Sequence, residues 1–599
     1  METINKLLDL LSPAERKRAG VLMAMMLVMA LLDMLGVASI LPFIAVLANP
    51  ALVETNPILS WAYQSSANVG VALVEQFLFL LGFLVFVLLV FSLTFKALTT
   101  YAQTRFALMR EYSIGKRLVE GYLHQPYSWF LNRHSADLGK TILSEVQTVM
   151  YYGILPLMTL LAQSAVTIAM LGLLLLVDPL LAVSVGLVLG IAYGGILALM
   201  SGWLNTLGQV RIQANQDRYT VVSEAFGAAK EVKAGGLERI FIERFAKPAE
   251  TYAKGQATAQ VIAQVPRFAL EAIAFGGMLL VILYLMAQSG SFAAALPIIA
   301  LYAFAGYRLM PALQQIYGAV TQLKFAGPAL KALHTDLMGL NHSESYNNVF
   351  EPLPFKKCIE LNNIFYQYPN ANAPALNGIH LSIPARSTVG LVGSTGSGKT
   401  TTVDLILGLL EPQEGTLCID GQVISASNRR QWQKSIGYVP QHIYLADDTV
   451  SANIAFGLAP EIVDQQAVER AAKIANLHDF VVQNMPQGYG TMVGERGVRL
   501  SGGQRQRIGI ARALYHNPSV LVLDEATSAL DNITEQAVMD AVNNLGHNIT
   551  IILIAHRLTT VRQCDQIYLL EKGELKARGT FEELVTQNYT FQKMTGSIQ

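Results

Sequence analysis

Charged residues and cysteines are both scarce in this chain. Only 14% of its 599 residues are charged, where soluble domains usually have about 25%. The 43 basic and 43 acidic residues cancel, so nothing suggests a nucleic-acid partner held by bulk charge. The three cysteines, Cys358, Cys418 and Cys564, form no CxxC pair, which argues against a zinc site or a disulfide framework. We expect them to be small buried residues of a domain that lies in the reducing cytosol.

Apolar residues are correspondingly abundant, mostly in the first half of the chain. Hydrophobic residues make up 52% of the sequence, and the mean hydropathy is +0.37. A helix needs about 20 apolar residues to cross the bilayer core. Six stretches are long enough, at residues 21–48, 71–97, 154–177, 180–200, 261–286 and 292–313. The sequence therefore predicts six membrane spans.

Lysine and arginine predict which side of the membrane each connection faces, because cytoplasmic flanks carry the excess of positive charge. Basic residues lie before the first span and fill the second and fourth connections, whereas residues 49–70 and the turns at 178–179 and 288–291 have none. We expect a multi-pass protein of the cytoplasmic (inner) membrane with both termini in the cytoplasm. The first apolar run is too long for a cleavable signal peptide, and the amphipathic residues before it predict an interfacial helix.

The second and fourth connections are too long for loops and keep helical patterns. We expect their helices to continue into the cytoplasm. Residues 124–130 and 223–231, at the two tips, are candidates for short helices that dock on a second domain, although ordinary helical turns are the alternative. Polarity rises over residues 334–357, which predicts a linker. The expected domains are 1–333 in the membrane and 358–599 beyond the linker.

The sequence GSTGSGKT at residues 393–400 fits the phosphate-binding pattern GxxxxGK[ST]. In this pattern the backbone N–H groups of a glycine-rich turn surround nucleotide phosphates, a lysine adds a point charge and the last hydroxyl binds Mg²⁺. A strand-like TVGLV precedes the pattern and an amphipathic helix follows it, as a phosphate site requires. We expect ATP and Mg²⁺ to be bound here, by Gly393, Ser394, Thr395, Gly396, Ser397, Gly398, Lys399, Thr400 and Thr401.

Further motifs accompany the phosphate loop: FYQYP at 365–369, GYVPQ at 437–441, VGERG at 493–497, LSGGQ at 500–504, VLVLDE at 520–525, SALD at 528–531 and IAHR at 554–557. With them, the segment from Cys358 onward resembles the nucleotide-binding domain of an ABC exporter over nearly its whole length. The resemblance implies an α-helical transmembrane domain of six spans fused to an α/β P-loop NTPase domain of ABC type. It also implies an ATPase whose hydrolysis is coupled to translocation.

The resemblance assigns roles to single residues of these motifs. Tyr368 matches the aromatic residue that stacks on adenine, although a core tyrosine is the alternative. Gln441 matches the glutamine that reaches Mg²⁺, and Asp524 is suited to hold the metal because Mg²⁺ prefers carboxylate oxygen. Together with Thr400 they form the expected Mg²⁺ site.

Catalysis is expected at Glu525, His556 and Lys399. Glu525 matches the general base that orients the attacking water, with a second Mg²⁺ carboxylate as the alternative. His556 matches the switch histidine that contacts the γ-phosphate, and this assignment depends on its spacing from Glu525 and on the resemblance. Residues 528–531 match the loop that joins two subunits, and residues 493–497 match a segment that meets the partner's cytoplasmic helices.

The LSGGQ motif implies a dimer. Ser501, Gly502, Gly503 and Gln504 open a helix, and a helix N-terminus is an anion site. This site should face another chain's ATP, so two ATP molecules would be shared between two chains. Because Glu525, His556 and the whole motif are intact, a homodimer is favoured.

Several functional classes compete. An ATP-driven exporter or flippase fits best. A soluble ABC ATPase of DNA-repair type is excluded by the membrane spans, and an importer is disfavoured because importers usually keep their two domains on separate chains. An ATP-gated channel or regulatory membrane protein stays open as a rare alternative.

Ionisable residues inside spans are expensive and point to function. Asp33 lies in the first predicted span, Lys96 in the second, Arg267 and Glu271 in the fifth, and Arg308 in the sixth. Arg267 and Glu271 have i,i+4 spacing and can neutralise each other, and Lys96 and Arg267 can also snorkel to the interface. No acidic residue lies within one turn of Arg308, so we expect a passing anion to be its partner. The candidate substrate residues are Lys96, Arg267 and Arg308.

The membrane half is similar to the PglK-type flippases of lipid-linked oligosaccharides in the stretches 33–43, 96–98, 266–271 and 307–311. The resemblance implies a polyprenyl-diphosphate glycan as cargo and membrane lipids as surroundings. Lys96 replaces an arginine of that family, which keeps the charge and loses bidentate phosphate geometry. Residues 49–70 could form an external interfacial helix or a plain loop. The runner-up cargoes are a lipid A-like glycolipid, a peptide or hydrophobic drugs.

Overall fold

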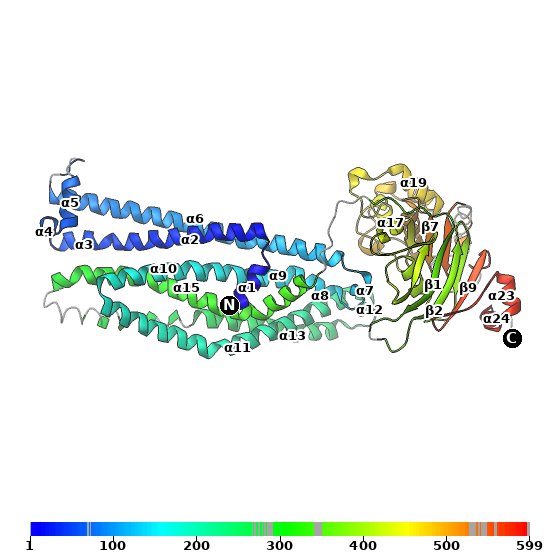
Figure 1. Ribbon diagram of the computed structural model, residues 1–599, viewed down its shortest axis with the longest axis horizontal. Coiled ribbons are helices and arrows are strands. Elements are labelled where there is room, and N and C mark those ends of the chain that lie inside the picture. Colours follow the sequence, from blue (N-terminus) through cyan, green and yellow to red (C-terminus); the bar gives the residue numbers. More distant parts are fainter. Residues whose placement is uncertain are drawn as a thin grey trace. The chain divides into compact units, whose positions relative to one another are not determined.

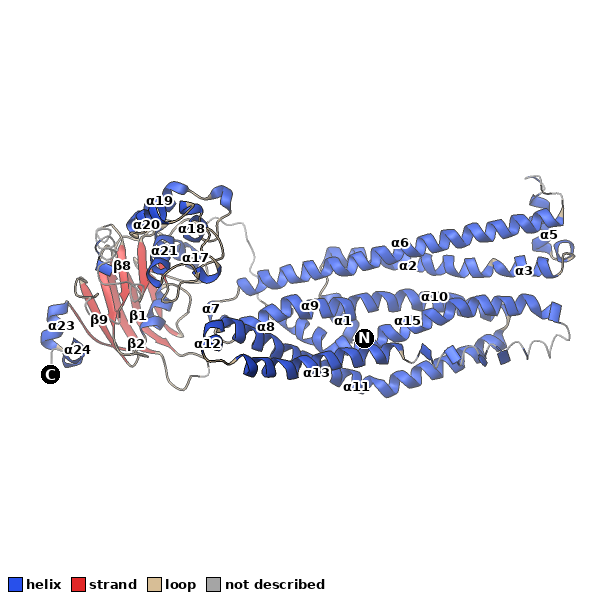
Figure 2. Ribbon diagram, turned by 180° about the vertical axis from the view of Figure 1, so that it is seen from behind, coloured by secondary structure: helices blue, strands red, loops and turns tan. Residues whose placement is uncertain are grey.

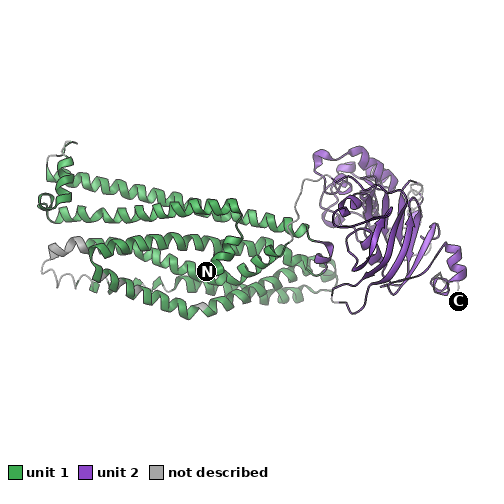
Figure 3. Ribbon diagram, in the orientation of Figure 1, with its two compact units in different colours: residues 1–125, 132–343 green, residues 126–131, 344–599 purple. Residues whose placement is uncertain are grey.

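The computed structural model describes most of the chain: residues 2–66, 68, 71, 73–265, 267–268, 271–272, 276–277, 279–280, 283, 292–340, 350–369, 371–525, 535–536, 540, 548–555 and 560–595. The chain divides into two compact units (Figure 3). Unit 1 comprises residues 1–125 and 132–343, and unit 2 comprises residues 126–131 and 344–599.

Unit 1 is helical, and its long helices run side by side (Figure 1). α1 covers Glu2–Asp9, α2 Pro13–Ala38, α3 Ile40–Ala48, α4 Leu52–Thr55, α5 Pro57–Ser66, α6 Val74–Leu123, α8 Ser135–Lys140, α9 Val146–Val149, α10 Leu155–Val177, α11 Pro179–Gly227, α12 Ala229–Ala234, α13 Glu238–Gln264 and α15 Phe292–Met338. Two π-helical turns, η2 (Thr141–Glu145) and η3 (Met150–Ile154), flank α9.

The apolar helices lie where the hydropathy pattern predicts them. Among the described residues, four helical stretches are long and apolar enough to cross a membrane: Pro13–Ala48, Val74–Leu123, Ser135–Val177 and Ala182–Met200. Asp178 caps α10 and Pro179 begins α11, so the predicted tight turn is present. The predicted sixth span falls on α15, whereas much of the fifth and its turn at 288–291 lie outside the described residues.

The long connections are helical, as predicted. α6 has 50 residues and α11 has 49, and a helix of 50 residues is about 75 Å long. Their tips carry two short helices, α7 (Tyr127–Phe130) and α12. Residues 126–131, with α7, group with unit 2. α15 runs on to Met338, past the expected start of the linker at residue 334.

The N-terminus is fixed by a cap and a buried ion pair. Ser12 and Glu15 form a capping box at the start of α2. The Glu15 carboxylate also accepts a hydrogen bond from Ser113 Oγ (2.7 Å) and pairs with Arg110, both on α6. In the predicted interfacial segment, Leu7 and Leu10 are buried within unit 1 while Leu8 is exposed. This segment therefore packs on its own helical unit along one face.

Residues 49–66 form two short helices, α4 and α5, so the helical alternative for this segment is confirmed there. Tyr63 packs edge-on against Phe77 of α6, with ring centroids 5.2 Å apart. Trp61 is 71% exposed. An exposed tryptophan beside a packed tyrosine is an amphipathic arrangement suited to a membrane interface.

A buried ion pair joins α11 to the π-helical turn η2. Arg211 Nη2 donates to Glu145 Oε2 (2.6 Å), and Asn215 Nδ2 donates to Glu145 Oε1 (2.8 Å). All three side chains are buried. A buried charge is tolerated only when it is paired and hydrogen-bonded, so this cluster fixes the register of the two helices.

Unit 2 is an α/β domain with two sheets (Figure 2). The first sheet is antiparallel, in the order β2-β1-β4-β5, with β1 at Cys358–Tyr366, β2 Leu376–Pro384, β4 Glu414–Ile419 and β5 Gln422–Val423. The second has the order β10-β9-β3-β8-β7-β6, with β3 at Thr388–Val392, β6 Ile436–Val439, β7 Val520–Asp524, β8 Thr550–Ile554, β9 Gln566–Glu571 and β10 Glu574–Gly579. All its pairs are parallel except β9 with β10.

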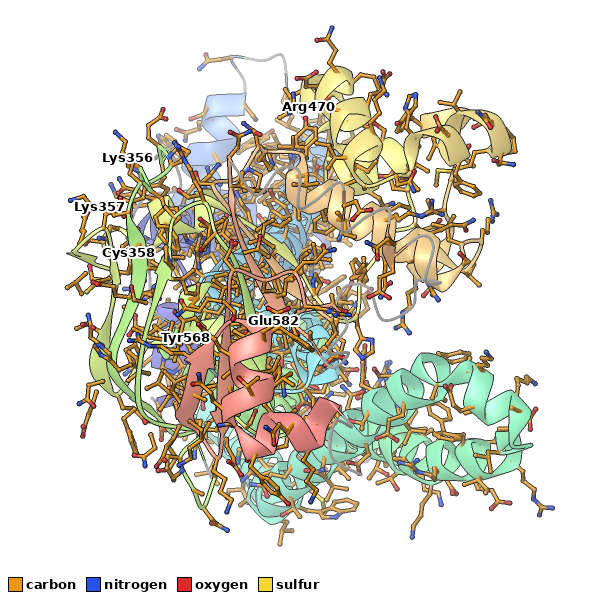
Figure 4. All side chains as sticks on the ribbon, turned by 90° about the vertical axis from the view of Figure 1, so that its right-hand side faces the viewer. Lys356, Lys357, Cys358, Arg470, Tyr568 and Glu582 are labelled. Carbon is orange, nitrogen blue, oxygen red and sulfur yellow. The ribbon has the colours of Figure 1, made fainter. Side chains whose placement is uncertain are left out.

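Helices complete unit 2: α16 covers Lys399–Ile406, α17 Arg429–Lys434, α18 Val450–Ile454, α19 Gln465–Ile474, α20 His478–Asn484, α21 Gly502–Leu514, α23 Phe581–Gln587 and α24 Tyr589–Thr595. Lys356, Lys357 and Cys358 follow one another into β1 (Figure 4), and their backbone N–H groups donate to the Asp420 carboxylate. All five residues of β3, of β7 and of β8 are buried. The three cysteines are free.

Candidate functional site

The sheet brings the nucleotide motifs to one edge. β3, β6, β7 and β8 are parallel, and each ends directly before a motif residue or one residue from it: Gly393, Gln441, Glu525 and Ala555. The carboxyl ends of parallel strands share one edge, which is where α/β sheets bind ligands. This placement brings motifs that are far apart in the sequence to the same edge of the sheet.

The phosphate loop connects β3 to α16 and needs glycine at two positions. Gly398 has φ +100°, and a Cβ there would lie 2.8 Å from Ala375 O. At Gly393, a Cβ would lie 2.1 Å from Leu570 O. No other residue fits such close backbone approaches, because any Cβ would collide. The strand and the helix that flank the loop lie where the sequence predicts them.

Lys399 is buried and folded back over the loop. Its Nζ donates to the carbonyl oxygens of Gly393 (2.9 Å) and Ser394 (3.0 Å). Burial lowers the pKa of the Lys399 ammonium, while the Glu525 and Asp524 carboxylates act in the opposite direction. The Ser397 hydroxyl is buried and has no hydrogen-bond partner among the described residues. Thr400 is exposed and Thr401 is buried.

The carboxylates follow β7. Asp524 is buried at the end of the strand, with the Tyr438 hydroxyl 3.5 Å from its Oδ2. Glu525 comes next in a left-handed conformation, φ +50°, and its backbone N–H donates to Ile554 O (3.1 Å). Its Oε2 accepts a hydrogen bond from Gln441 Nε2 (2.8 Å). The structure thus joins the expected base to the expected Mg²⁺-reaching glutamine, in a rare backbone conformation typical of functional sites.

Asp404 was not expected from the sequence. It lies on α16 and is only 9% exposed. Burial, with the nearby Asp524 carboxylate as second cause, raises its pKa to about 6. In the sequence, Asp404 is a lone aspartate in the helix after the phosphate loop. Such a residue is equally well interpreted as an exposed helix residue.

Tyr368 lies half-buried just past β1. Its hydroxyl is 3.1 Å from Thr401 Oγ1, and its ring packs edge-on against Tyr366 with centroids 5.1 Å apart. Burial raises the pKa of the Tyr368 phenol. The hydroxyl therefore anchors the ring beside the helix of the phosphate loop, and its stacking on adenine stays a prediction.

The LSGGQ motif forms a helix start. Ser501 is the N-cap of α21, and its Oγ accepts from the backbone N–H of Gln504 (3.2 Å). The Gln504 side chain accepts in turn from the Ser501 N–H (2.8 Å). This capping box leaves the first glycine N–H groups, at Gly502 and Gly503, at the positive end of the helix. His556 and residues 528–531 lie outside the described residues.

These residues fit a nucleotide with Mg²⁺. The glycines of the loop leave space that a Cβ would fill. The loop also has a buried serine hydroxyl with no hydrogen-bond partner among the described residues, and a lysine that faces backbone carbonyls. The donor set for a hard cation is also right, because it offers carboxylate, amide and hydroxyl oxygen from Asp524, Gln441 and Thr400.

A second cluster lies among the apolar helices of unit 1, with Asp33 at its centre. The Asp33 carboxylate accepts hydrogen bonds from Ser92 Oγ (2.7 Å), Arg308 Nη1 (3.2 Å) and Lys96 Nζ (3.3 Å). The side chain of Asp33 is 0% exposed, that of Arg308 15% and that of Lys96 32%. The cluster joins α2, α6 and α15 and carries two cations against one anion.

The expectation that Arg308 has no acidic partner is wrong. It considered only residues one turn away on the same helix, whereas the partner comes from α2. Arg267 is not joined to this cluster by any contact among the described residues. It pairs with Glu271 (2.6 Å), as the i,i+4 spacing suggested, and its side chain is 59% exposed. Glu271 also accepts from Gln314 Nε2 of α15 (3.3 Å).

The comparisons with known proteins agree with this architecture. The ABC transporter family profile matches residues 376–528, and the ABC transporter transmembrane region matches residues 55–311. An ATP-dependent lipid A-core flippase of Cupriavidus metallidurans is 32% identical over 487 residues, which are 79% of each chain. A solved bacterial Atm1-family ABC exporter with ATP bound has a similar fold, with a TM-score of 0.78, 24% identity, and coverage of 98% of this chain and 99% of that one.

Other relatives match over the ATPase-sized part alone. The ABC transporter B family member 28 of Arabidopsis thaliana is 39% identical over 273 residues, 45% of this chain and 38% of the relative. The match to the lipid A-core flippase of Saccharophagus degradans, at 43% identity, spans 40% of each chain. The chain thus belongs to the ABC transporter family, with a transmembrane region and an ATPase domain on one chain, as in a half-transporter of the exporter type.

Proposed function

We propose that this half-transporter flips a phosphorylated glycolipid across the inner membrane. The observation that carries the proposal is the convergence of Lys96 and Arg308 on the buried carboxylate of Asp33. Charged groups among apolar helices are expensive and are retained where they handle a substrate or an ion. Two cations against one anion leave one positive charge for an incoming anion.

Phosphate is the ligand that this charge suits best. A neutral drug would gain nothing from a guanidinium and an ammonium, whereas a phosphate forms charge-assisted hydrogen bonds with both. Asp33 serves as the resident counter-ion, which pairs with both cations and competes with an incoming phosphate for them. Arg267 is a secondary candidate contact, since it is exposed but already paired with Glu271.

Two kinds of phosphorylated glycolipid meet this requirement. A lipid A-core type of cargo is favoured by the relatives that carry this name, including the one that matches 79% of the chain. A polyprenyl-diphosphate oligosaccharide is favoured by the stretches around Lys96, Arg267 and Arg308, which resemble the PglK-type flippases. Both cargoes share an apolar tail, phosphate and sugar. Peptides and neutral drugs are the remaining candidates.

In the ATPase unit, we propose Glu525 as the general base, held in place by the Gln441 amide. Lys399 and the loop N–H groups bind the phosphates, Tyr368 stacks on the adenine and His556 contacts the γ-phosphate. Mg²⁺, when bound by Thr400, Gln441 and Asp524, supplies positive charge against the phosphate oxygens. The carbonyl oxygens of Gly393 and Ser394 hold the Lys399 ammonium at the loop, and its third N–H donor can meet a phosphate oxygen.

The working unit is proposed to be a homodimer. The positive end of α21, capped by Ser501, completes the site of a second copy, whose own α21 does the same in return. Each ATP is then bound between a phosphate loop and the partner's LSGGQ motif. The ATPase units are proposed to face the cytoplasm, where the basic connections also lie.

The test is lipid-stimulated ATPase activity of the purified protein in nanodiscs. Arg308→Ala should abolish the stimulation by a phosphorylated glycolipid and leave basal hydrolysis unchanged, because the nucleotide site is untouched. Arg244→Ala is a matched control, since it also removes an arginine from an ion pair, with Glu224, but on exposed helical surface. Its stimulation should equal that of the wild type.

Four lipids or solutes separate the cargo classes: a lipid A-core glycolipid, a polyprenyl-diphosphate glycan, a neutral drug and a peptide. Stimulation by either phosphorylated glycolipid supports the proposal and chooses between its two forms. Stimulation by the drug or the peptide alone, or full stimulation of Arg308→Ala, overturns it.

A further inference from the structure

Unit 1 holds a cavity whose polar lining is neutral. It has a volume of about 310 Å³ and lies between α10, α13 and α15, near η3. α15 runs alongside both α10 and α13 (Figure 2). The polar part of the lining includes the amides of Gln260, Gln264, Gln315 and Gln322, and the rings of Tyr152 and Phe325 flank them. No lysine, arginine, aspartate or glutamate is among the described residues that line this amide cavity.

The amides that line the cavity have donors and acceptors that no other described residue uses. Gln163 Nε2 donates to Gln315 Oε1 (2.9 Å), which uses one of the two lone pairs of this oxygen. No hydrogen bond joins the side-chain amides of Gln260, Gln264 or Gln322 to another residue of the described part of the chain. Each amide offers two donors and one acceptor. A group of such amides matches hydroxyls, which both donate and accept.

The aromatic rings add a second feature suited to sugars. Tyr152 and Phe325 pack edge-on with centroids 5.7 Å apart. Flat apolar rings beside hydrogen-bonding amides complement a sugar ring, which has apolar C–H faces and a polar rim. The cavity is also large enough for a small polar group, because ligand sites usually measure about 300–1,000 Å³.

The amide cavity and the cluster around Asp33 both include residues from the same face of α15. Arg308, Gln315 and Gln322 follow one another at intervals of seven residues on α15. Seven residues make almost two turns, so the three side chains share one face, and each step is about 10 Å along the helix. One ligand that contains phosphate and sugar can therefore meet Arg308 and the amides together.

We propose that the amide cavity binds the sugar hydroxyls of the cargo while Lys96 and Arg308 bind its phosphate. This inference rests on the proposed function and adds a separate sugar site to it. It makes the transporter selective for glycosylated over bare phosphate lipids. The shared chemistry is a sugar attached to a phosphate, from either lipid A-core or a polyprenyl diphosphate.

The test compares two lipids in nanodiscs, a phosphorylated glycolipid and a phosphate lipid without sugar, by the concentration that gives half-maximal ATPase stimulation. The wild type should prefer the glycolipid. Gln322→Leu and Gln315→Leu keep a side chain of similar size without the amide, and each should reduce this preference about five- to tenfold, as expected for one or two lost hydrogen bonds. The response to the sugar-free lipid should stay unchanged.

Gln314→Leu is the matched control, because Gln314 is the neighbour of Gln315 and donates to Glu271 outside the cavity. It should keep the wild-type preference. If a leucine variant fails to fold, Gln322→Asn retracts the amide by one methylene and should move the preference in the same direction.

The outcomes separate this inference from the proposed function. Unchanged preference in Gln315→Leu and Gln322→Leu, with the wild type still stimulated by both lipids, overturns the sugar site alone. No stimulation of the wild type by any phosphate lipid overturns the proposed function. A peptide whose stimulation is lost in Gln322→Leu would assign the cavity to peptides and also overturn the inference.

Discussion

Asp33→Asn gives the sharpest test of the counter-ion role. The substitution keeps the size of the side chain and removes its charge, so the cluster changes from two cations with one anion to two cations alone. An anion that competes with Asp33 for Arg308 should then bind more tightly. A residue that merely orients Arg308 would have the opposite effect when it is removed.

The magnitude follows from the geometry. Asp33 contacts both cations at 3.2 and 3.3 Å, so a phosphate on the other side of the guanidinium would be on the order of 6 Å from the carboxylate. Two like charges at this separation repel by about 2–3 kcal/mol at an effective dielectric constant of about 20. Relief of this repulsion should tighten phosphate-lipid binding about 30- to 150-fold.

The same substitution should destabilise the protein without ligand. Removing one partner of a buried ion pair costs about 3–5 kcal/mol, because the other charge is left buried. Lys96 is about a third exposed, so the lower end applies. A phosphorylated lipid should restore the lost thermal stability. We also expect slower turnover, because cargo that binds more tightly in the starting state is released more slowly.

The assay is the dissociation constant of a phosphorylated glycolipid and of its dephosphorylated form, for the wild type and Asp33→Asn in nanodiscs. Ser92→Ala is the control, since it removes one hydrogen bond to Asp33 and no charge. Only Asp33→Asn should change the ratio of the two constants. Weaker binding of the phosphorylated lipid, or an equal change for both lipids, would refute the reasoning.

Three further predictions concern the ATPase unit. Glu525→Gln should keep ATP binding and reduce turnover at least 100-fold, because the general base is lost; hydrolysis at the wild-type rate would remove Glu525 from that role. Ser501→Arg should inactivate the protein, and mixing it with Lys399→Ala should restore at most one of two shared sites; strong ATPase activity from a monodisperse monomer would contradict shared sites. Asp404 has a pKa raised to about 6 in the folded state, so the native protein binds its proton more tightly than the unfolded chain and loses stability as the pH rises from about 4 to 6. Asp404→Asn should therefore raise the unfolding temperature at pH 8 in nucleotide-free buffer with a chelator, and should have little effect at pH 4; an equal gain at both pH values would contradict the role of the charge.

The sequence predicted the ATPase unit closely because its motifs are local. The strand 388–392, the glycine-rich loop and the strand ending at Asp524 each occupy the predicted residues. Their meeting at one sheet edge was not predicted, because it depends on the pairing of strands that lie far apart in the sequence, such as β3 with β8. Asp404 was missed because its raised pKa depends on its burial and on the carboxylate of Asp524, which lies far away in the sequence at the end of β7.

The membrane half was harder to predict. Hydropathy locates apolar helices but says nothing about which faces meet. The pairing of Asp33 with Arg308 joins residues 275 positions apart, and no periodic pattern within either helix could reveal it. The amide cavity was missed for the same reason, because its glutamines come from α13 and α15 and each alone looks like an ordinary polar residue.

ATP-dependent translocation tests the central claim most directly. The purified protein would be reconstituted in liposomes with a fluorescent phosphorylated glycolipid, its dephosphorylated form, a neutral drug or a peptide, and the labelled molecule that reaches the opposite leaflet or compartment would be measured. We expect ATP-dependent transfer of the phosphorylated glycolipid and little of the other three, with transfer lost in both Glu525→Gln and Arg308→Ala. Transfer of the drug or the peptide in place of the phosphorylated lipid, or full transfer by Arg308→Ala, would contradict the account.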